Sequence, residues 1–256
     1  MKSLILKLLT PIKSIIEFII EMECHIARSW VSSAHKRLMA VQWLIPESPE
    51  HFDHHIDLYY QWLETRNSLW VERGVFGSLA LKGNKVLELA CGDGFNAKNF
   101  YSLHSHSVIA CDFDPAAIKT ANNKNQAENL TFVLADIRNE MPGNKSEFDN
   151  IVWDAAIEHF TEVEIEKIMK DIKNRLTESG VLSGYTIVER YDGEKHIHQH
   201  EYEFKSKEDL MRFLEPHFTN VRVFETIFPT RHNLYFWASD SVIPFDSDWS
   251  LMLSNH

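Results

Sequence analysis

The sequence contains few cysteines, and they have the spacing neither of metal ligands nor of a disulfide framework. Only Cys24, Cys91 and Cys111 occur among the 256 residues. A disulfide-stapled miniprotein is therefore excluded. Sparse cysteines of this kind are typical of proteins in a reducing compartment, so we expect a cytoplasmic protein.

Basic residues are also scarce. Lysine and arginine together number 26, against 37 aspartates and glutamates, which gives a net charge of −11. Such a surface would repel a polyanion, so we expect a small-molecule partner and no nucleic acid. With 44% hydrophobic and 25% charged residues, the composition is that of a folded globular protein and excludes a disordered chain.

The N-terminal segment lacks an apolar run long enough to cross a bilayer. Lys7, Lys13 and Glu17 interrupt residues 1–22, and Pro11 predicts a break in any helix formed there. No small-residue cleavage site follows, which argues against a secretory signal. What remains is an isoleucine-rich amphipathic pattern. Its apolar face either packs on the protein body or on a second subunit of a homo-oligomer, or makes peripheral contact with a membrane.

From residue 85 onwards, short apolar runs alternate with helical stretches. The runs are 85–90, 107–112, 130–134, 150–153 and 180–188, followed by two closely spaced runs at 221–228 and 233–238. This alternation predicts a parallel sheet with helices on both faces, and the last two runs predict an antiparallel hairpin at its edge. We therefore expect an α/β, Rossmann-like, seven-stranded and mostly parallel sheet behind a helical N-terminal cap.

Helix-start signals agree with this layout. Asp114 followed by Pro115 predicts an N-cap, and Thr161 with Glu164 predicts a capping box. Ser206 precedes another short helix. The expected organisation has three segments: a helical cap over residues 1–80, the sheet domain over 81–240 and a tail over 241–256.

The strongest local signal is VLELACGDGFNA, residues 86–97, in which a buried strand runs into a glycine-containing turn. Gly92 and Gly94 remove side chains where the backbone must approach a ligand. This spacing alone also fits a dinucleotide-binding fingerprint. Glu88 separates the two interpretations, because a carboxylate inside an apolar strand needs a partner. That partner is either an ammonium-bearing ligand or an internal arginine or lysine.

Acidic residues recur where the next two strands end. Asp112 follows SVIAC, and Asp136 follows FVLA. In open α/β sheets ligands lie at the carboxyl ends of the strands, so we expect these carboxylates to converge with the glycine turn. Asp112 can accept both hydroxyls of a ribose, and Asp136 can accept from an exocyclic amine such as that of adenine.

These features together resemble the class I S-adenosylmethionine-dependent methyltransferases over residues 85–188, and the hairpin extends the likeness to about residue 240. The first motif reads Glu88-x-Ala90-x-Gly92-x-Gly94, with alanine where the family more often has glycine. The resemblance implies that S-adenosylmethionine is the cofactor. It also implies a set of cofactor-binding residues: Glu88, Ala90, Cys91, Gly92, Asp93, Gly94, Asp112, Phe113, Asp136, Ile137 and Asp154.

The resemblance also assigns roles within that set. Glu88 and the turn after it hold the methionine end of the cofactor, and Asp112 holds the ribose. Phe113 flanks the adenine, while Asp136 and the backbone of Ile137 read its edge. The fourth strand, FDNIVWDAAIEHF, matches the motif that lines the methyl group, with its aspartate at residue 154 facing the cofactor.

Histidines stand where a methyl acceptor is expected. His159 follows the fourth strand, and His200 opens a segment that by resemblance faces the substrate. We expect one of them to take the proton of an alcohol. In an extended segment, His196, His198 and His200 would share one face. They would then line the substrate site, lie in a solvated loop or bind a transition metal; we expect no metal.

The expected function is methyl transfer from S-adenosylmethionine to a small molecule, with the hydroxyl of a sugar, glycoconjugate or other metabolite as the favoured acceptor. A phenolic or quinone-like lipid at the membrane surface is the nearest alternative, because it would explain the apolar N-terminus. An NAD-dependent oxidoreductase is a different class, disfavoured by Glu88 and Asp136. A non-catalytic cofactor-binding subunit is the third alternative, which measurable turnover would exclude.

Overall fold

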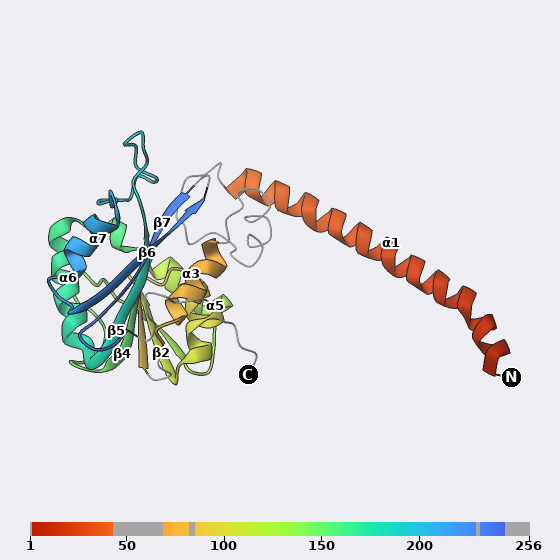
Figure 1. The fold of residues 1–256 in the computed structure, drawn as a ribbon, viewed down its shortest axis with the longest axis horizontal. Coiled ribbons are helices and arrows are strands. Elements are labelled where there is room, and N and C mark those ends of the chain that lie inside the picture. The colour runs from red at the N-terminus through yellow and green to blue at the C-terminus, as the bar shows by residue number, and fades with distance from the viewer. Residues whose placement is uncertain (1, 43–68, 82–84, 229–230, 244–256) are drawn as a thin grey trace. The chain divides into compact units, whose positions relative to one another are not determined.

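A computed structural model describes residues 2–42, 69–81, 85–228 and 231–243 (Figure 1). The chain divides into two compact units, residues 1–60 and 61–256. The described part of the first unit is one helix, whereas the second unit contains the sheet. The predicted boundaries of the sheet domain, after residue 80 and after residue 240, stay predictions.

In the first unit, helix α1 spans Lys2–Gln42 without interruption. The predicted break at Pro11 is therefore wrong. A proline inside a helix removes one hydrogen bond at a cost of about 3 kcal/mol, and long helices often kink there without ending. The side chains of Ile15, Ile19 and Ile26 lie on one side of α1 and are exposed. Within the described residues, no helix has the length and apolar character needed to cross a membrane.

The second unit is built on a seven-stranded sheet with the order β3-β2-β1-β4-β5-β7-β6. Its strands are β1 Lys85–Leu89, β2 Ser107–Asp112, β3 Leu130–Leu134, β4 Phe148–Asp154, β5 Leu176–Ile187, β6 Asn220–Phe228 and β7 Arg231–Ser239. Strands β1 to β5 are parallel, and β7 pairs antiparallel with both β5 and β6. The predicted Rossmann-like sheet and its edge hairpin are confirmed.

Helices cover both faces of this sheet. Figure 1 shows α6 and α7 on one face and α3 and α5 on the other. The helical elements are α3 Leu69–Ser78, α4 Phe95–Asn99, η2 Tyr101–His104, α5 Pro115–Lys124, η3 Ile157–His159, α6 Glu162–Arg175 and α7 Lys207–Leu214. The predicted caps are present: Asp114 caps α5, Thr161 and Glu164 form the capping box of α6, and Ser206 caps α7.

Side chains alternate between the two faces along a strand, so a strand covered on both sides buries both sets. On β1, Leu87 and Leu89 belong to the core beneath α6 and α7, whereas Val86 packs with Tyr101 on the opposite face. The same alternation places Glu88 on the face of Val86. A carboxylate is thereby positioned inside the layer that contains α3, α4 and η2.

Candidate functional site

The turn after β1 has a backbone that favours glycine. Ala90, Gly92 and Gly94 adopt φ angles of +54°, +54° and +77°. A Cβ atom on Gly94 would lie 2.4 Å from the ring of Phe132, so packing requires glycine there. A Cβ atom on Gly92 would meet no atom of the described residues within 4 Å. Gly92 therefore leaves free space in which a ligand can approach the backbone.

Glu88 lies beside this turn without a hydrogen-bond partner for one of its oxygens. Its side chain is 3% exposed, and Oε2 accepts no hydrogen bond from the described residues. Burial, reinforced by the negative charge of Asp154, raises the pKa of Glu88 well above its usual value. Arg73 is a neighbouring cation, but its guanidinium donates to Asp154. An ammonium-bearing ligand could thus donate a hydrogen bond to Oε2 of Glu88, to which no described lysine or arginine donates.

Asp112, at the end of β2, is held against the turn by two backbone amides. Gly92 N donates to its Oδ2 and Asp114 N to its Oδ1, both at 2.9 Å. The side chain is 5% exposed. A carboxylate oxygen can accept more than one hydrogen bond, so this position is compatible with the predicted contact to two ribose hydroxyls. The structure thus brings Asp112 and the glycine turn together.

The residues predicted to hold an adenine lie at the ends of β2 and β3. Phe113 is 63% exposed, and the Arg138 guanidinium lies 5.7 Å from the centre of its ring. Asp136 accepts from Arg138 Nε and Nη2, each at 2.9 Å, and this hydrogen bonding lowers its pKa. Ile137 is buried. The sequence interpretation missed Arg138, which competes with any ligand for the Asp136 carboxylate.

Asp154, at the end of β4, receives hydrogen bonds from two elements on the same face. Arg73 Nε on α3 and Asn96 Nδ2 on α4 both donate to its Oδ2 at 2.9 Å. These two partners were not predicted. Arg73 lies outside the stretch with recognisable motifs, and its only signal is a basic residue among the apolar positions of LWVERGVF.

The two predicted catalytic histidines are brought together by the loop after β5. Glu201 N and Tyr202 N donate to the carbonyl oxygen of Glu158 at 2.8 and 3.1 Å, which docks this loop on η3. As a result, the rings of His159 and His200 lie 4.8 Å apart between centroids. Burial lowers the pKa of His200 below its usual value, so this imidazole is neutral at neutral pH.

The expectation that His196, His198 and His200 share one face is wrong, because their segment is a loop and not a strand. His196 Nε2 lies 3.0 Å from the carbonyl oxygen of Val188, and His198 is exposed. Only His200 points toward η3. There it meets His159 and Glu158, and one ligand atom from each of these three residues lies within 4.8 Å of the others. Sequence reasoning missed Glu158.

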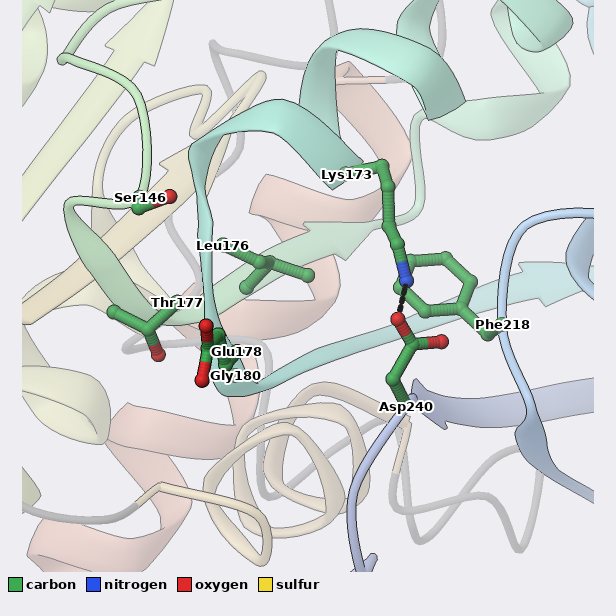
Figure 2. Close-up of a pocket in the computed structure, with 8 residues that line it drawn as sticks. All are labelled: Ser146, Lys173, Leu176, Thr177, Glu178, Gly180, Phe218 and Asp240. Carbon is green, nitrogen blue, oxygen red and sulfur yellow. Dashed lines mark hydrogen bonds and ion pairs between the residues drawn. The ribbon is translucent and has the colours of Figure 1, made fainter.

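A pocket elsewhere in the molecule does not include any predicted site residue. It lies near the start of β5 and the end of β7, at the opposite end of the parallel strands (Figure 2). Leu176 and Phe218 supply its apolar part, and Lys173 pairs with Asp240 beside them. Ligands of open α/β sheets bind at the carboxyl ends, so the candidate site is the one formed around β1, β2 and β4.

Comparison with known proteins agrees with this choice. Residues 86–180 match the family model described as a methyltransferase domain, and this match decides against the NAD-dependent oxidoreductase. No curated protein matches the sequence.

Several solved structures share the fold. The YcgJ protein of Bacillus subtilis is 13% identical, with a TM-score of 0.54 over 64% of this chain and 95% of its own. DhpI in complex with SAM and HEP is 16% identical, with a TM-score of 0.56 over 71% and 90%. A SAM-dependent methyltransferase of Leishmania major is 16% identical, with a TM-score of 0.51 over 65% and 69%. Residues 86–180 thus match a methyltransferase domain, and the sheet-containing unit has the fold of the class I S-adenosylmethionine-dependent methyltransferases.

Proposed function

We propose that this protein transfers the methyl group of S-adenosylmethionine to the hydroxyl oxygen of a small molecule, such as a sugar, a glycoconjugate or another metabolite. The observation that carries the cofactor assignment is Glu88, whose buried Oε2 has no hydrogen-bond partner among the described residues and lies beside the open space at Gly92. The ammonium group of S-adenosylmethionine could bind Oε2 of Glu88, and the rest of the cofactor could occupy the open space at Gly92. DhpI, which has the same fold, is solved with SAM.

The other strand ends supply the remaining contacts of the proposed cofactor site. Asp112 would accept the ribose hydroxyls, and Phe113 would stack on the adenine. Asp136 and the backbone of Ile137 would bind the adenine edge once Arg138 shares or releases the carboxylate. Bound S-adenosylmethionine would supply a methyl group that is already activated by its sulfonium.

The protein's own contribution is then to position the acceptor and to handle its proton. Holding two reactants in line can lower the barrier by about 7–11 kcal/mol. A hydroxyl must also lose its proton, and a well-placed base contributes roughly 10²–10⁴-fold. His159 and His200 lie side by side just beyond β4, where the matching motif of the family faces the methyl group. These two histidines favour a hydroxyl over an amine or an already acidic acceptor, which needs less help.

The net charge bears on the class of acceptor, and the cysteines bear on the compartment of the protein. A net charge of −11 disfavours a nucleic acid. The described cysteines are free, which is typical of the reducing cytoplasm in which we place the protein.

A phenolic or quinone-like lipid is a second candidate acceptor. The observation that favours it is the apolar face of α1, where Ile15 and Ile19 are more than half exposed. An amphipathic helix of this kind can lie in a membrane interface and bring an enzyme to a lipid substrate.

The proposed reaction can be tested with methyl-labelled S-adenosylmethionine and fractionated extracts of water-soluble metabolites and of lipids. We expect label to enter a water-soluble product as an O-methyl group that mass spectrometry locates. Label on nitrogen or carbon would contradict the hydroxyl acceptor, and label only in the lipid fraction would favour the second candidate. Turnover with any acceptor excludes a non-catalytic binding subunit.

A further inference from the structure

The triad Glu158, His159 and His200 has the donor set and the spacing of a metal site. Its ligand atoms lie within 4.8 Å of one another. Atoms that bind one ion at about 2.0–2.2 Å lie no more than about 4.4 Å apart, so small side-chain rotations would close the site. Glu158 and His200 are 3% and 5% exposed. The triad is therefore held by the fold and does not consist of loose surface groups.

Each imidazole is oriented by a hydrogen bond through its Nδ1 atom. His159 Nδ1 lies 3.2 Å from the carbonyl oxygen of Gln199, and His200 Nδ1 bonds to Oε1 of Glu203. A carbonyl oxygen only accepts, so Nδ1 of His159 carries the proton, and the carboxylate of Glu203 favours the same tautomer for His200. In this tautomer, Nε2 of each ring keeps its lone pair for a ligand. Metal-binding histidines are usually held in this way.

The carboxylate of the triad is oriented as well. Thr186 Oγ1 donates to Oε2 of Glu158 at 3.0 Å, and the backbone on either side of the triad is fixed by the docking of Glu201 and Tyr202 on η3. Ligating carboxylates commonly have such an outer hydrogen bond.

The charges around the triad point to a cation. The side chains of Glu158 and Glu203 are both nearly inaccessible. Among the described residues, neither carboxylate is paired with a lysine or an arginine. Two buried carboxylates without a basic side chain beside them are costly to ionise in the absence of a counter-charge. A divalent ion would neutralise them.

We propose that Glu158, His159 and His200 bind one divalent first-row transition-metal ion, such as Zn²⁺, beside the methyl acceptor. Two imidazole nitrogens and one carboxylate oxygen suit such ions, and three protein ligands leave a position open. The catalytic part of this inference rests on the proposed function. With a metal bound, both Nε2 atoms would be occupied, so the ion would replace either histidine as the group that assists loss of the proton. The open position would bind the acceptor's hydroxyl oxygen, whose O–H bond then breaks more easily, with the proton passing to solvent water.

The binding of metal alone tests the site, without any acceptor. Full-length protein treated with a chelator and dialysed is titrated by calorimetry with Zn²⁺, and by visible absorption with Co²⁺. We expect one saturable equivalent in the wild type. His159→Ala, His200→Ala and Glu158→Gln should each weaken binding at least 10-fold, and Glu203→Gln should weaken it about 10–100-fold through the orientation of His200.

The matched control is His198→Ala, which removes an exposed histidine of the same loop and should bind as the wild type does. Circular dichroism shows whether each variant is folded. Only folded triad variants are compared with the control. The proposal is overturned if the wild type takes up no saturable equivalent, or if folded triad variants bind as tightly as His198→Ala.

A titration of the metal-free protein with S-adenosylhomocysteine separates this inference from the proposed function. If S-adenosylhomocysteine binds and Zn²⁺ does not, the metal site is wrong and the cofactor assignment stands. If Zn²⁺ binds to the triad and S-adenosylhomocysteine does not bind even with the metal present, the proposed function fails and the metal site stands.

Discussion

Glu88 combines an apolar strand environment with a group that must ionise to bind an ammonium ion. Its raised pKa follows from burial and from the nearby charge of Asp154. A carboxyl whose pKa is higher in the folded than in the unfolded protein stabilises the fold fully below the unfolded pKa. That contribution is lost as the pH rises through the folded pKa. Ligand-free protein should therefore carry a neutral Glu88 above the pH at which an ordinary glutamate ionises.

Binding of S-adenosylhomocysteine, which has an ammonium group, should then ionise Glu88 and release a proton. The measurement is calorimetry at one pH in buffers of different ionisation enthalpy, where the observed binding enthalpy reports the protons released. We expect release from the wild type and none from Glu88→Gln, which should also bind more weakly. Equal proton release by the two proteins would show that Glu88 does not meet the ammonium group.

Ala90 and Gly92 share a left-handed backbone but should respond in opposite ways to substitution. Alanine in this region costs roughly 1–2 kcal/mol relative to the ordinary helical region, whereas glycine does not pay this penalty. Ala90→Gly should therefore raise the free energy of unfolding by about 1 kcal/mol and leave cofactor binding intact.

Gly92→Ala introduces the same backbone strain without a clash with the described part of the chain, where no atom lies within 4 Å of its Cβ. We expect a folded variant, about 1–2 kcal/mol less stable, in which the methyl group occupies the ligand's space and binding is lost. Thermal unfolding and calorimetry distinguish the two effects. Undiminished affinity in Gly92→Ala would mean that the cofactor does not approach this turn.

At the level of elements, the proposed acceptor side of the site consists of η3 and the loop after β5. Because Glu158 anchors residues 201 and 202 through its backbone carbonyl, the two histidines are held by main-chain contacts as well as by side chains. Substitution of either histidine side chain should therefore lower the rate of methyl transfer more than it lowers the stability of the fold.

His159→Asn and His200→Asn test this arrangement. At least one should lower turnover on an alcohol acceptor by about 10²–10⁴-fold while leaving the affinity for S-adenosylhomocysteine unchanged. His198→Asn, in the same loop but exposed, should retain activity. Near-normal turnover in both His159→Asn and His200→Asn would leave methyl transfer by positioning alone, on an amine or an acidic hydroxyl.

Helix α1 presents an isoleucine face whose partner we expect to be protein. Ile15→Asp combined with Ile19→Asp should dissociate an oligomer or lower the unfolding temperature, as ultracentrifugation and thermal unfolding would show. Ser14→Asp combined with Cys24→Asp is the control, since it adds the same charge on the polar side of the helix. Co-sedimentation of the wild type with anionic vesicles, lost only in the isoleucine variant, would contradict this expectation and favour a lipid acceptor.

At the scale of the whole molecule, the fold was predictable because its signals are local. Each buried strand is a short apolar run, and the helix starts at Asp114, Thr161 and Ser206 use side chains that cap their own helices. Glu88 and Asp112 could be proposed as site residues for the same reason: a carboxylate stands out within or at the end of an apolar run. Strand order then brings them together.

The parts that could not be predicted depend on contacts between distant segments. Glu158 lies close to both histidines only because the loop carrying His200 docks on η3, and Arg73 reaches Asp154 only because α3 packs against the end of β4. The spacing of His196, His198 and His200 was misleading, because alternation has meaning only in a strand and this segment is a loop. Pro11 likewise predicts a local disruption but does not determine where a long helix ends.

The central claim is that the carboxyl ends of β1 and β2 bind S-adenosylmethionine. Calorimetric titration of S-adenosylhomocysteine into the wild type and into Asp112→Ala tests it most directly, with NAD as the competing ligand. Asp114→Ala, which removes only the cap of α5, serves as the stability control. We predict that the wild type binds S-adenosylhomocysteine and not NAD, and that Asp112→Ala loses about 1.5–3 kcal/mol of binding free energy with the two ribose hydrogen bonds. Unchanged affinity in a folded Asp112→Ala protein, or binding of NAD instead, would contradict the account.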